Sequence, residues 1–299
     1  MAALLKRILR RRMAEKRSGR GRMAAARTTG AQSRKTAQRS GRSEADRRRR
    51  VHGQNFLVDR ETVQRFVRFA DPDPGEVVLE VGAGNGAITR ELARLCRRVV
   101  AYEIDRHFAD RLREATAEDP RIEVVAGDFL KTSQPKVPFS VVGNIPFGNT
   151  ADIVDWCLNA RRLRTTTLVT QLEYARKRTG GYRRWSRLTV ATWPEVEWRM
   201  GERISRRWFR PVPAVDSAVL RLERRPVPLI PPGLMHDFRD LVETGFTGKG
   251  GSLDASLRRR FPARRVAAGF RRARLEQGVV VAYVTPGQWI TLFEELHGR

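Results

Sequence analysis

The residues best suited to chemistry lie in the run Asn144-Ile145-Pro146-Phe147, which directly follows the apolar segment 139–142. Because Pro146 cannot continue a hydrogen-bonded ladder, a buried strand is predicted to end here. The run offers a side-chain amide, backbone carbonyls and an aromatic ring, but no acid, histidine or thiol. Such groups can accept both hydrogens of an exocyclic amine and stack on its ring. We predict a nucleobase site, although Asn-x-Pro is also a common turn and Phe a common core residue.

A glycine loop follows another apolar segment, and Gly82-x-Gly84-x-x-Ala87 fits the dinucleotide-binding pattern. Glu103 stands 21 residues after Gly82, at the expected end of the next strand. An acid in that position can accept hydrogen bonds from ribose hydroxyls. The loop and the acid therefore predict a cofactor that contains a nucleoside, without saying which one.

Three further side chains favour S-adenosylmethionine (SAM) as that cofactor. Glu80 precedes the glycines, where a carboxylate would repel a pyrophosphate but suits the zwitterionic amino acid end of SAM. Asp128 follows a third strand and can accept from the adenine amine, while Phe129 can pack on the ring. The alternative is that Glu80 and Asp128 cap the next segments and that Phe129 belongs to the core.

An alternating series of strands and helices must position these groups. Strands are expected at 76–81, 98–104, 121–126, 139–143, 165–170 and 217–222, with another within 188–198; helices are expected at 60–70 after an Asp59 cap, 87–97, 105–118 and 153–159. This alternation predicts a Rossmann-like, mostly parallel sheet of seven strands with ligands at the carboxyl ends. From about residue 226 the pattern becomes helical, with Thr285-Pro286 as a helix start.

Composition points to a polyanionic partner. The 299 residues carry a net charge of +26, and residues 1–50 hold 15 Arg and 3 Lys against 3 acids. That arm is predicted to be disordered alone and to contact RNA phosphates, the alternative being a solvated tail. Cys96 and Cys157 lack metal-ligand spacing, so we expect no metal and a reduced, cytoplasmic compartment. No apolar segment approaches the ~20 residues of a membrane helix; a signal peptide is not expected, and a transit peptide is the lesser alternative for the arm.

The motifs together resemble the rRNA adenine N6-methyltransferase superfamily. They are Gly53-Gln54-Asn55-Phe56-Leu57, Glu80 to Gly86, Glu103-Ile104-Asp105, Gly127-Asp128-Phe129, Asn144-Ile145-Pro146-Phe147 and Phe209-x-Pro211-x-Pro213-x-Val215-Asp216-Ser217, in a match from about Val51 to His297. Ile145 and Phe147, with the following Gly-Asn-Thr, resemble the erythromycin-resistance (Erm) branch, which methylates one adenine of 23S rRNA. The housekeeping 16S rRNA dimethyladenosine transferases and a non-catalytic nucleic-acid-binding factor of this fold are the alternatives.

The resemblance implies a role for each matching residue. Asn144, Ile145, Pro146 and Phe147 would hold the target adenine, although Phe147 replaces the family's usual Tyr and lacks its hydroxyl. The expected cofactor residues are Gln54, Asn55, Leu57, Glu80, Gly82, Gly84, Glu103, Ile104, Asp128, Phe129 and Asn144. The expected organisation is a basic arm (1–50), a SAM-dependent methyltransferase domain (51–225) and a helical RNA-contacting domain (226–299), in a protein that acts as a monomer.

Overall fold

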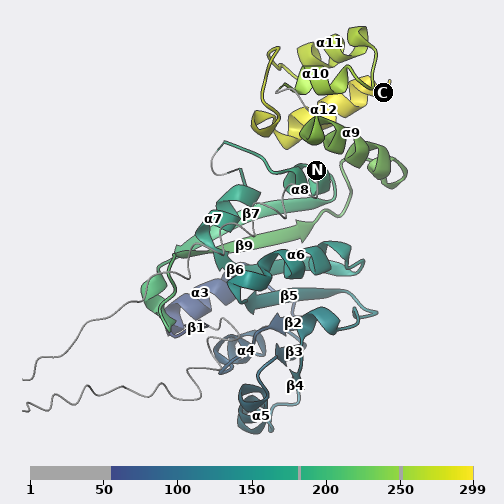
Figure 1. The fold of residues 1–299 in the computed structure, drawn as a ribbon. Helices are drawn as coiled ribbons and strands as arrows, with labels where there is room; N and C mark the ends of the chain where they lie inside the picture. The colour runs from purple at the N-terminus through teal and green to yellow at the C-terminus, as the bar shows by residue number, and fades with distance from the viewer. Residues whose placement is uncertain (1–54, 181–182, 249–251, 299) are drawn as a thin grey trace, which may run out of the picture. The chain divides into compact units, whose positions relative to one another are not determined.

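The computed structural model describes residues 55–180, 183–248 and 252–298 (Figure 1). The predicted basic arm and Gln54 lie outside these residues. A seven-stranded sheet runs through the first part, in the order β4-β3-β2-β5-β6-β9-β7. Its strands are β2 (Val77–Val81), β3 (Arg98–Glu103), β4 (Ile122–Ala126), β5 (Phe139–Asn144), β6 (Leu163–Gln171), β7 (Val196–Ile204) and β9 (Ser217–Arg224).

The five strands from β4 to β6 pair in parallel, whereas β9 is antiparallel to both β6 and β7. The expected Rossmann-like, mostly parallel sheet of seven strands is therefore confirmed. The chain leaves β2 toward β3 on one side and later returns as β5 on the other side. Ligands of such sheets bind where the strand order reverses, so the position next to β2 and β5 is the place to look for a site.

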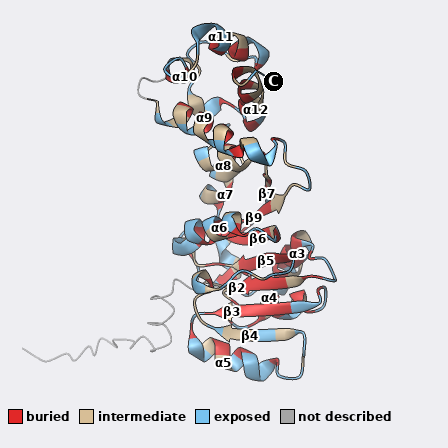
Figure 2. Ribbon diagram, turned by 90° about the vertical axis from the view of Figure 1, so that its right-hand side faces the viewer, coloured by how far each residue is buried: buried red, intermediate tan, exposed pale blue. Residues whose placement is uncertain are grey.

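Helices cover both faces of the sheet, and each face has its own core. Val78 and Val142 pack with α3 (Arg60–Ala70) and α4 (Ala87–Leu92). The adjacent Leu79 and Val141 pack on the opposite face, with α6 (Thr150–Asn159). Figure 2 shows the central strands buried along their length. Burial on both faces explains why these strands are continuous apolar runs and do not alternate with polar residues.

Several expected boundaries differ from the structure. The helix expected at 87–97 ends at Leu92, because the chain turns through Leu92–Cys96 to enter β3. The strand expected within 188–198 is wrong at its start: residues Arg187–Thr192 form a helix, α8, and β7 begins at Val196. Ser186 caps α8 by accepting a hydrogen bond from the Thr189 N–H. The β-branched residues of this segment favour a strand, so the sequence pattern did not reveal this helix start.

The last part of the described chain is helical, as expected. Its helices are α9 (Met235–Thr247), α10 (Leu253–Leu257), α11 (Ala263–Arg272) and α12 (Pro286–Leu296). They enclose a third core around Phe238 and Trp289, which Val190 of α8 joins. Thr285 and Gln288 form a capping box at the start of α12. The division at residue 226 stays a prediction. Within the described residues, no helix has the length and apolar character that crossing a membrane requires.

A second, two-stranded sheet joins distant parts of the chain. Residues Phe56–Leu57 form β1, which pairs antiparallel with β8 (Phe209–Arg210). The Val58 N–H extends this pairing by donating to the Trp208 carbonyl at 2.9 Å. Each strand has only two residues, so the sequence pattern predicted neither.

Close contact between β2 and β5 leaves no room for a side chain at Gly143. A Cβ there would lie 2.4 Å from the Val81 carbonyl oxygen. We expect Gly143→Ala to lower the free energy of unfolding by roughly 3 kcal/mol, because backbone must move to relieve the overlap. Chemical denaturation checks this against Gly287→Ala in α12, where a Cβ meets nothing within 4 Å. Equal stability of the two variants would contradict the close approach.

Candidate active site

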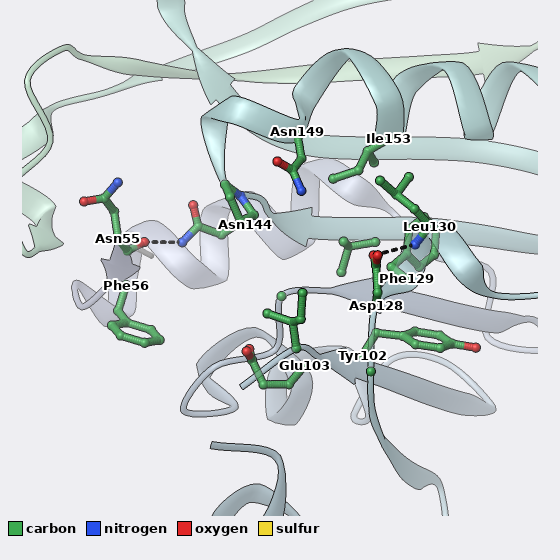
Figure 3. Close-up of a pocket in the computed structure, with 15 residues that line it drawn as sticks. Asn55, Phe56, Tyr102, Glu103, Asp128, Phe129, Leu130, Asn144, Asn149 and Ile153 are labelled. Carbon is green, nitrogen blue, oxygen red and sulfur yellow. Dashed lines mark hydrogen bonds between the residues drawn. The ribbon is translucent and has the colours of Figure 1, made fainter. Parts of the chain in front are cut away.

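A cavity opens at the carboxyl ends of β2, β3, β4 and β5 (Figure 3). The residues that line it are Asn55, Phe56, Val81, Gly82, Tyr102, Glu103, Ile104, Gly127, Asp128, Phe129, Leu130, Asn144, Pro146, Asn149 and Ile153. The cavity therefore lies at the reversal of strand order, where the fold predicts a ligand.

The structure brings eight of the predicted site residues into the wall of this cavity: Asn55, Gly82, Glu103, Ile104, Asp128, Phe129, Asn144 and Pro146. Leu57, Glu80, Gly84, Ile145 and Phe147 are not part of the wall. Leu57 and Ile145 have buried side chains, and their predicted roles in the site stay predictions.

Other wall residues were missed by sequence reasoning, namely Phe56, Val81, Tyr102, Gly127, Leu130, Asn149 and Ile153. Most stand next to a predicted residue, so the strand-end rule could have found them. Asn149 is the N-cap residue of α6 and Ile153 lies in its first turn, and only the spacing of four residues connects them.

Glu103 organises the glycine loop. One carboxylate oxygen, Oε2, accepts a hydrogen bond from the Gly84 N–H at 2.8 Å, and Oε1 accepts from the Asp105 N–H at 2.9 Å. Gly84 has a φ of +55°, and a Cβ on it would lie 2.6 Å from the Phe56 ring. Because Gly84 has no side chain, the ring of Phe56 can lie against the loop. The Gly84 N–H also holds the Glu103 carboxylate in place.

Asp128 and Phe129 have the cap and core contacts of the alternative interpretation, and both also line the cavity; their contacts with a cofactor stay a prediction. Asp128 Oδ1 caps a short 3-10 helix, η1 (Phe129–Lys131), by accepting from the Leu130 N–H at 3.0 Å, yet the residue also lines the cavity. Phe129 is buried in an aromatic group, with ring centroids 5.5 Å from Tyr102 and 4.5 Å from Trp156. The cap and the core contacts hold both side chains in place at the cavity wall.

The orientation of the Asn144 amide is fixed by one contact. Its Nδ2 donates to the backbone carbonyl of Asn55 at 2.7 Å (Figure 3). Because a carbonyl can only accept, the nitrogen must face Asn55, and Oδ1 is turned away as an acceptor. This bond joins the end of β5 to the residue just before β1, so the amide is held from two sides.

Phe147 lies just beyond this amide. It is half-buried and begins a second 3-10 helix, η2 (Phe147–Asn149), which leads directly into α6. The Thr150 hydroxyl donates to the Phe147 carbonyl at 3.0 Å and tightens the turn. Pro146, and not Phe147, therefore forms the cavity wall, and the Phe147 ring stands outside it.

Glu80 has an unusual environment for an acid. It lies in β2 with 1% of its surface exposed, and its carboxyl lies near Thr89 in the first turn of α4. Burial is the main cause that raises the pKa of Glu80 to about 8; nearby Glu103 contributes to the rise, whereas hydrogen bonds with Thr89 and the charge of Arg90 oppose it. The interpretation of Glu80 as a cap of the following segment stays a prediction.

This raised pKa predicts how stability depends on pH. The folded protein keeps a proton on Glu80 that the unfolded chain loses above pH 4.5, so this residue's contribution to stability falls between pH 4.5 and about 8. We expect the free energy of unfolding to fall across that range by on the order of 4 kcal/mol more in the wild type than in Glu80→Gln. Denaturation of both proteins without cofactor, at several pH values, measures the difference. Parallel pH profiles would show that Glu80 titrates normally.

The fold and the cavity define a Rossmann-like methyltransferase domain, and comparison with known proteins places it further. Residues 45–298 match the family described as ribosomal RNA adenine dimethylase. An rRNA adenine N-6-methyltransferase of Saccharopolyspora erythraea is 53% identical over 256 residues, which cover 86% of this chain and 67% of that protein. The mycinamicin-resistance protein MyrB of Micromonospora griseorubida is 37% identical, over 81% of this chain and 76% of that protein.

A solved structure is similar throughout the described fold. The crystal structure of the 23S rRNA methyltransferase ErmE has a TM-score of 0.79 and 52% identity, covering 81% of this chain and all of that one. The chain therefore belongs to the ribosomal RNA adenine dimethylase family.

Proposed function

We propose that this protein transfers a methyl group from SAM to N6 of a specific adenine in 23S rRNA and so gives resistance to macrolide, lincosamide and streptogramin B antibiotics. The observation that carries the proposal is the Asn144 amide, which a hydrogen bond to the Asn55 carbonyl orients at the wall of the cavity. The 52–53% identity to relatives named for rRNA adenine or 23S rRNA methylation favours 23S over 16S rRNA as the substrate.

The residues of the cavity fit SAM. Glu103, held by two backbone N–H groups, would accept from the ribose hydroxyls, and Asp128 would accept from the adenine amine. The apolar side chains of Ile104 and Phe129 would pack on the ring. Glu80, buried directly before the loop, would suit the cationic amino group of the cofactor.

The main task of the protein in this reaction is to orient the adenine amine toward the methyl group of SAM. SAM supplies a methyl group that is already strongly electrophilic, whereas the N6 lone pair of adenine is delocalised into its ring. Asn144 Oδ1 and the Ile145 carbonyl would accept the two N6–H bonds and favour a pyramidal nitrogen. Phe147, at the rim, would stack on the flipped base. The proton leaves to solvent after transfer, so no general base is needed.

Methyl transfer from labelled SAM to protein-free 23S and 16S rRNA, offered separately, tests the proposal. Primer extension maps the modified base. We expect a stop at a single adenine of 23S rRNA and macrolide resistance in a sensitive host. Label on 16S rRNA alone would instead assign the housekeeping activity. A protein that binds RNA but neither binds nor consumes SAM would be the non-catalytic factor.

A further inference from the structure

Asn149 is a polar wall residue to which the proposed mechanism gives no task. It is exposed and stands at the junction of η2 and α6. Figure 3 shows its side-chain amide directed into the cavity, between Asn144 and Asp128. Although Asn149 occupies the N-cap position of α6, its side chain makes no capping hydrogen bond. An amide that leaves a helix start uncapped and turns into a cavity is available to a ligand.

Its neighbours indicate which part of a ligand it would meet. Ile153 follows one turn later on the same face of α6, is buried, and lines the cavity together with Leu130 and Phe129. These apolar side chains gather around Asp128 (Figure 3). They form the part of the cavity suited to a flat ring, and Asn149 stands at the edge of that part.

We propose that Asn149 binds the adenine ring of the cofactor at its N7 edge; this rests on the proposed function. Asp128 is an acceptor and takes one of the two N6–H groups. The other N6–H and the neighbouring N7 form an edge with one donor and one acceptor. A side-chain amide matches that edge with its oxygen and its nitrogen, as Asn does when it recognises adenine in DNA. Asn149 thus determines specificity for an adenine-containing cofactor.

Binding of S-adenosylhomocysteine (SAH), the product that SAM leaves after methyl transfer, tests this without RNA or turnover. We expect Asn149→Ala to raise the Kd of SAH roughly 3- to 10-fold by calorimetry with the full chain, the effect of one or two neutral hydrogen bonds. Asn149→Asp should also bind more weakly than the wild type, because its oxygens can accept from N6–H but cannot donate to N7. Aspartate is a good N-cap, so loss of the helix start cannot explain a weaker Kd.

The 7-deaza analogue of SAH identifies the contacted atom. The wild type should bind this analogue roughly 3- to 10-fold more weakly than SAH, whereas Asn149→Ala should bind the two alike. Asn159→Ala, at the other end of α6, is the matched control and should behave as the wild type.

Three results would overturn the proposal. Equal SAH affinity of the wild type and Asn149→Ala excludes a cofactor contact, and a loss of RNA affinity in that variant would assign Asn149 to the target base. If the 7-deaza analogue bound more weakly than SAH by the same factor in the wild type and in Asn149→Ala, a contact of Asn149 with N7 would be excluded. Failure of the wild type to bind SAH overturns the proposed function itself, and the inference with it.

Discussion

Replacing Asn144 by alanine is expected to lower kcat for methyl transfer at least about 100-fold, the usual cost of losing a fixed group that stabilises developing charge. Positive charge develops on N6 as the methyl arrives, and Asn144 Oδ1, which remains an acceptor when Nδ2 bonds the Asn55 carbonyl, is the group that we propose stabilises it. Single-turnover methylation of 23S rRNA at saturating SAM measures the effect on the chemical step without contributions from product release.

The control for this result must separate chemistry from the shape of the cavity. Asn144→Ala also removes the bond to Asn55, so the Kd of SAH should rise, but only by roughly 3- to 10-fold. Asn159→Ala removes an amide that bonds only within α6 and should leave both quantities unchanged. An Asn144→Ala protein that kept more than a tenth of the wild-type rate would remove Asn144 from the proposed mechanism.

Replacing Glu103 by alanine is expected to weaken SAH binding about 100-fold or more. The variant loses the acceptor for the ribose, and it leaves the buried N–H groups of Gly84 and Asp105 without the carboxylate that now binds them. Each such loss costs about 1–3 kcal/mol, and the loop that they shape forms the floor of the cavity. Calorimetry measures the Kd, and thermal denaturation reports the accompanying loss of stability.

Glu123→Ala on the neighbouring strand β4 is the matched control. Glu123 is exposed and pairs with Arg98 at the surface, so its removal should change the SAH Kd by less than about 2-fold. If Glu103→Ala bound SAH as well as this control does, Glu103 would be a structural residue of the loop and not a cofactor ligand.

The parts of the fold that follow from local pattern could be predicted from the sequence. Mainly apolar segments such as 139–142 predict buried strands, and the glycine loop and the acids at strand ends predict a cofactor site at the edge where the cavity lies. The cap at Asp59 is confirmed, since its carboxylate accepts from the Thr62 N–H at 2.9 Å. The expected Erm-type fold and activity agree with the relatives of the chain.

The parts that depend on tertiary contact could not be predicted. Pro146 lines the cavity whereas Phe147, which begins η2, does not, and no local pattern separates the two residues. The role of Phe147 at the target base stays a prediction. Asn149 reaches the cavity only because α6 starts where that turn ends. The pairing of β1 with β8 connects residues more than 150 positions apart, and no local pattern encodes such a contact.

That pairing also affects how the protein is made. Asn55 and Phe56 form one wall of the cavity. The strand that pairs with Phe56 is β8, which is synthesised after all five parallel strands of the large sheet. A nascent chain emerging from the ribosome can therefore complete the glycine loop and its acids early, but it cannot close the cavity until β8 has left the exit tunnel. The proposed 23S rRNA methyltransferase would thus gain a complete cofactor site only late in its own translation.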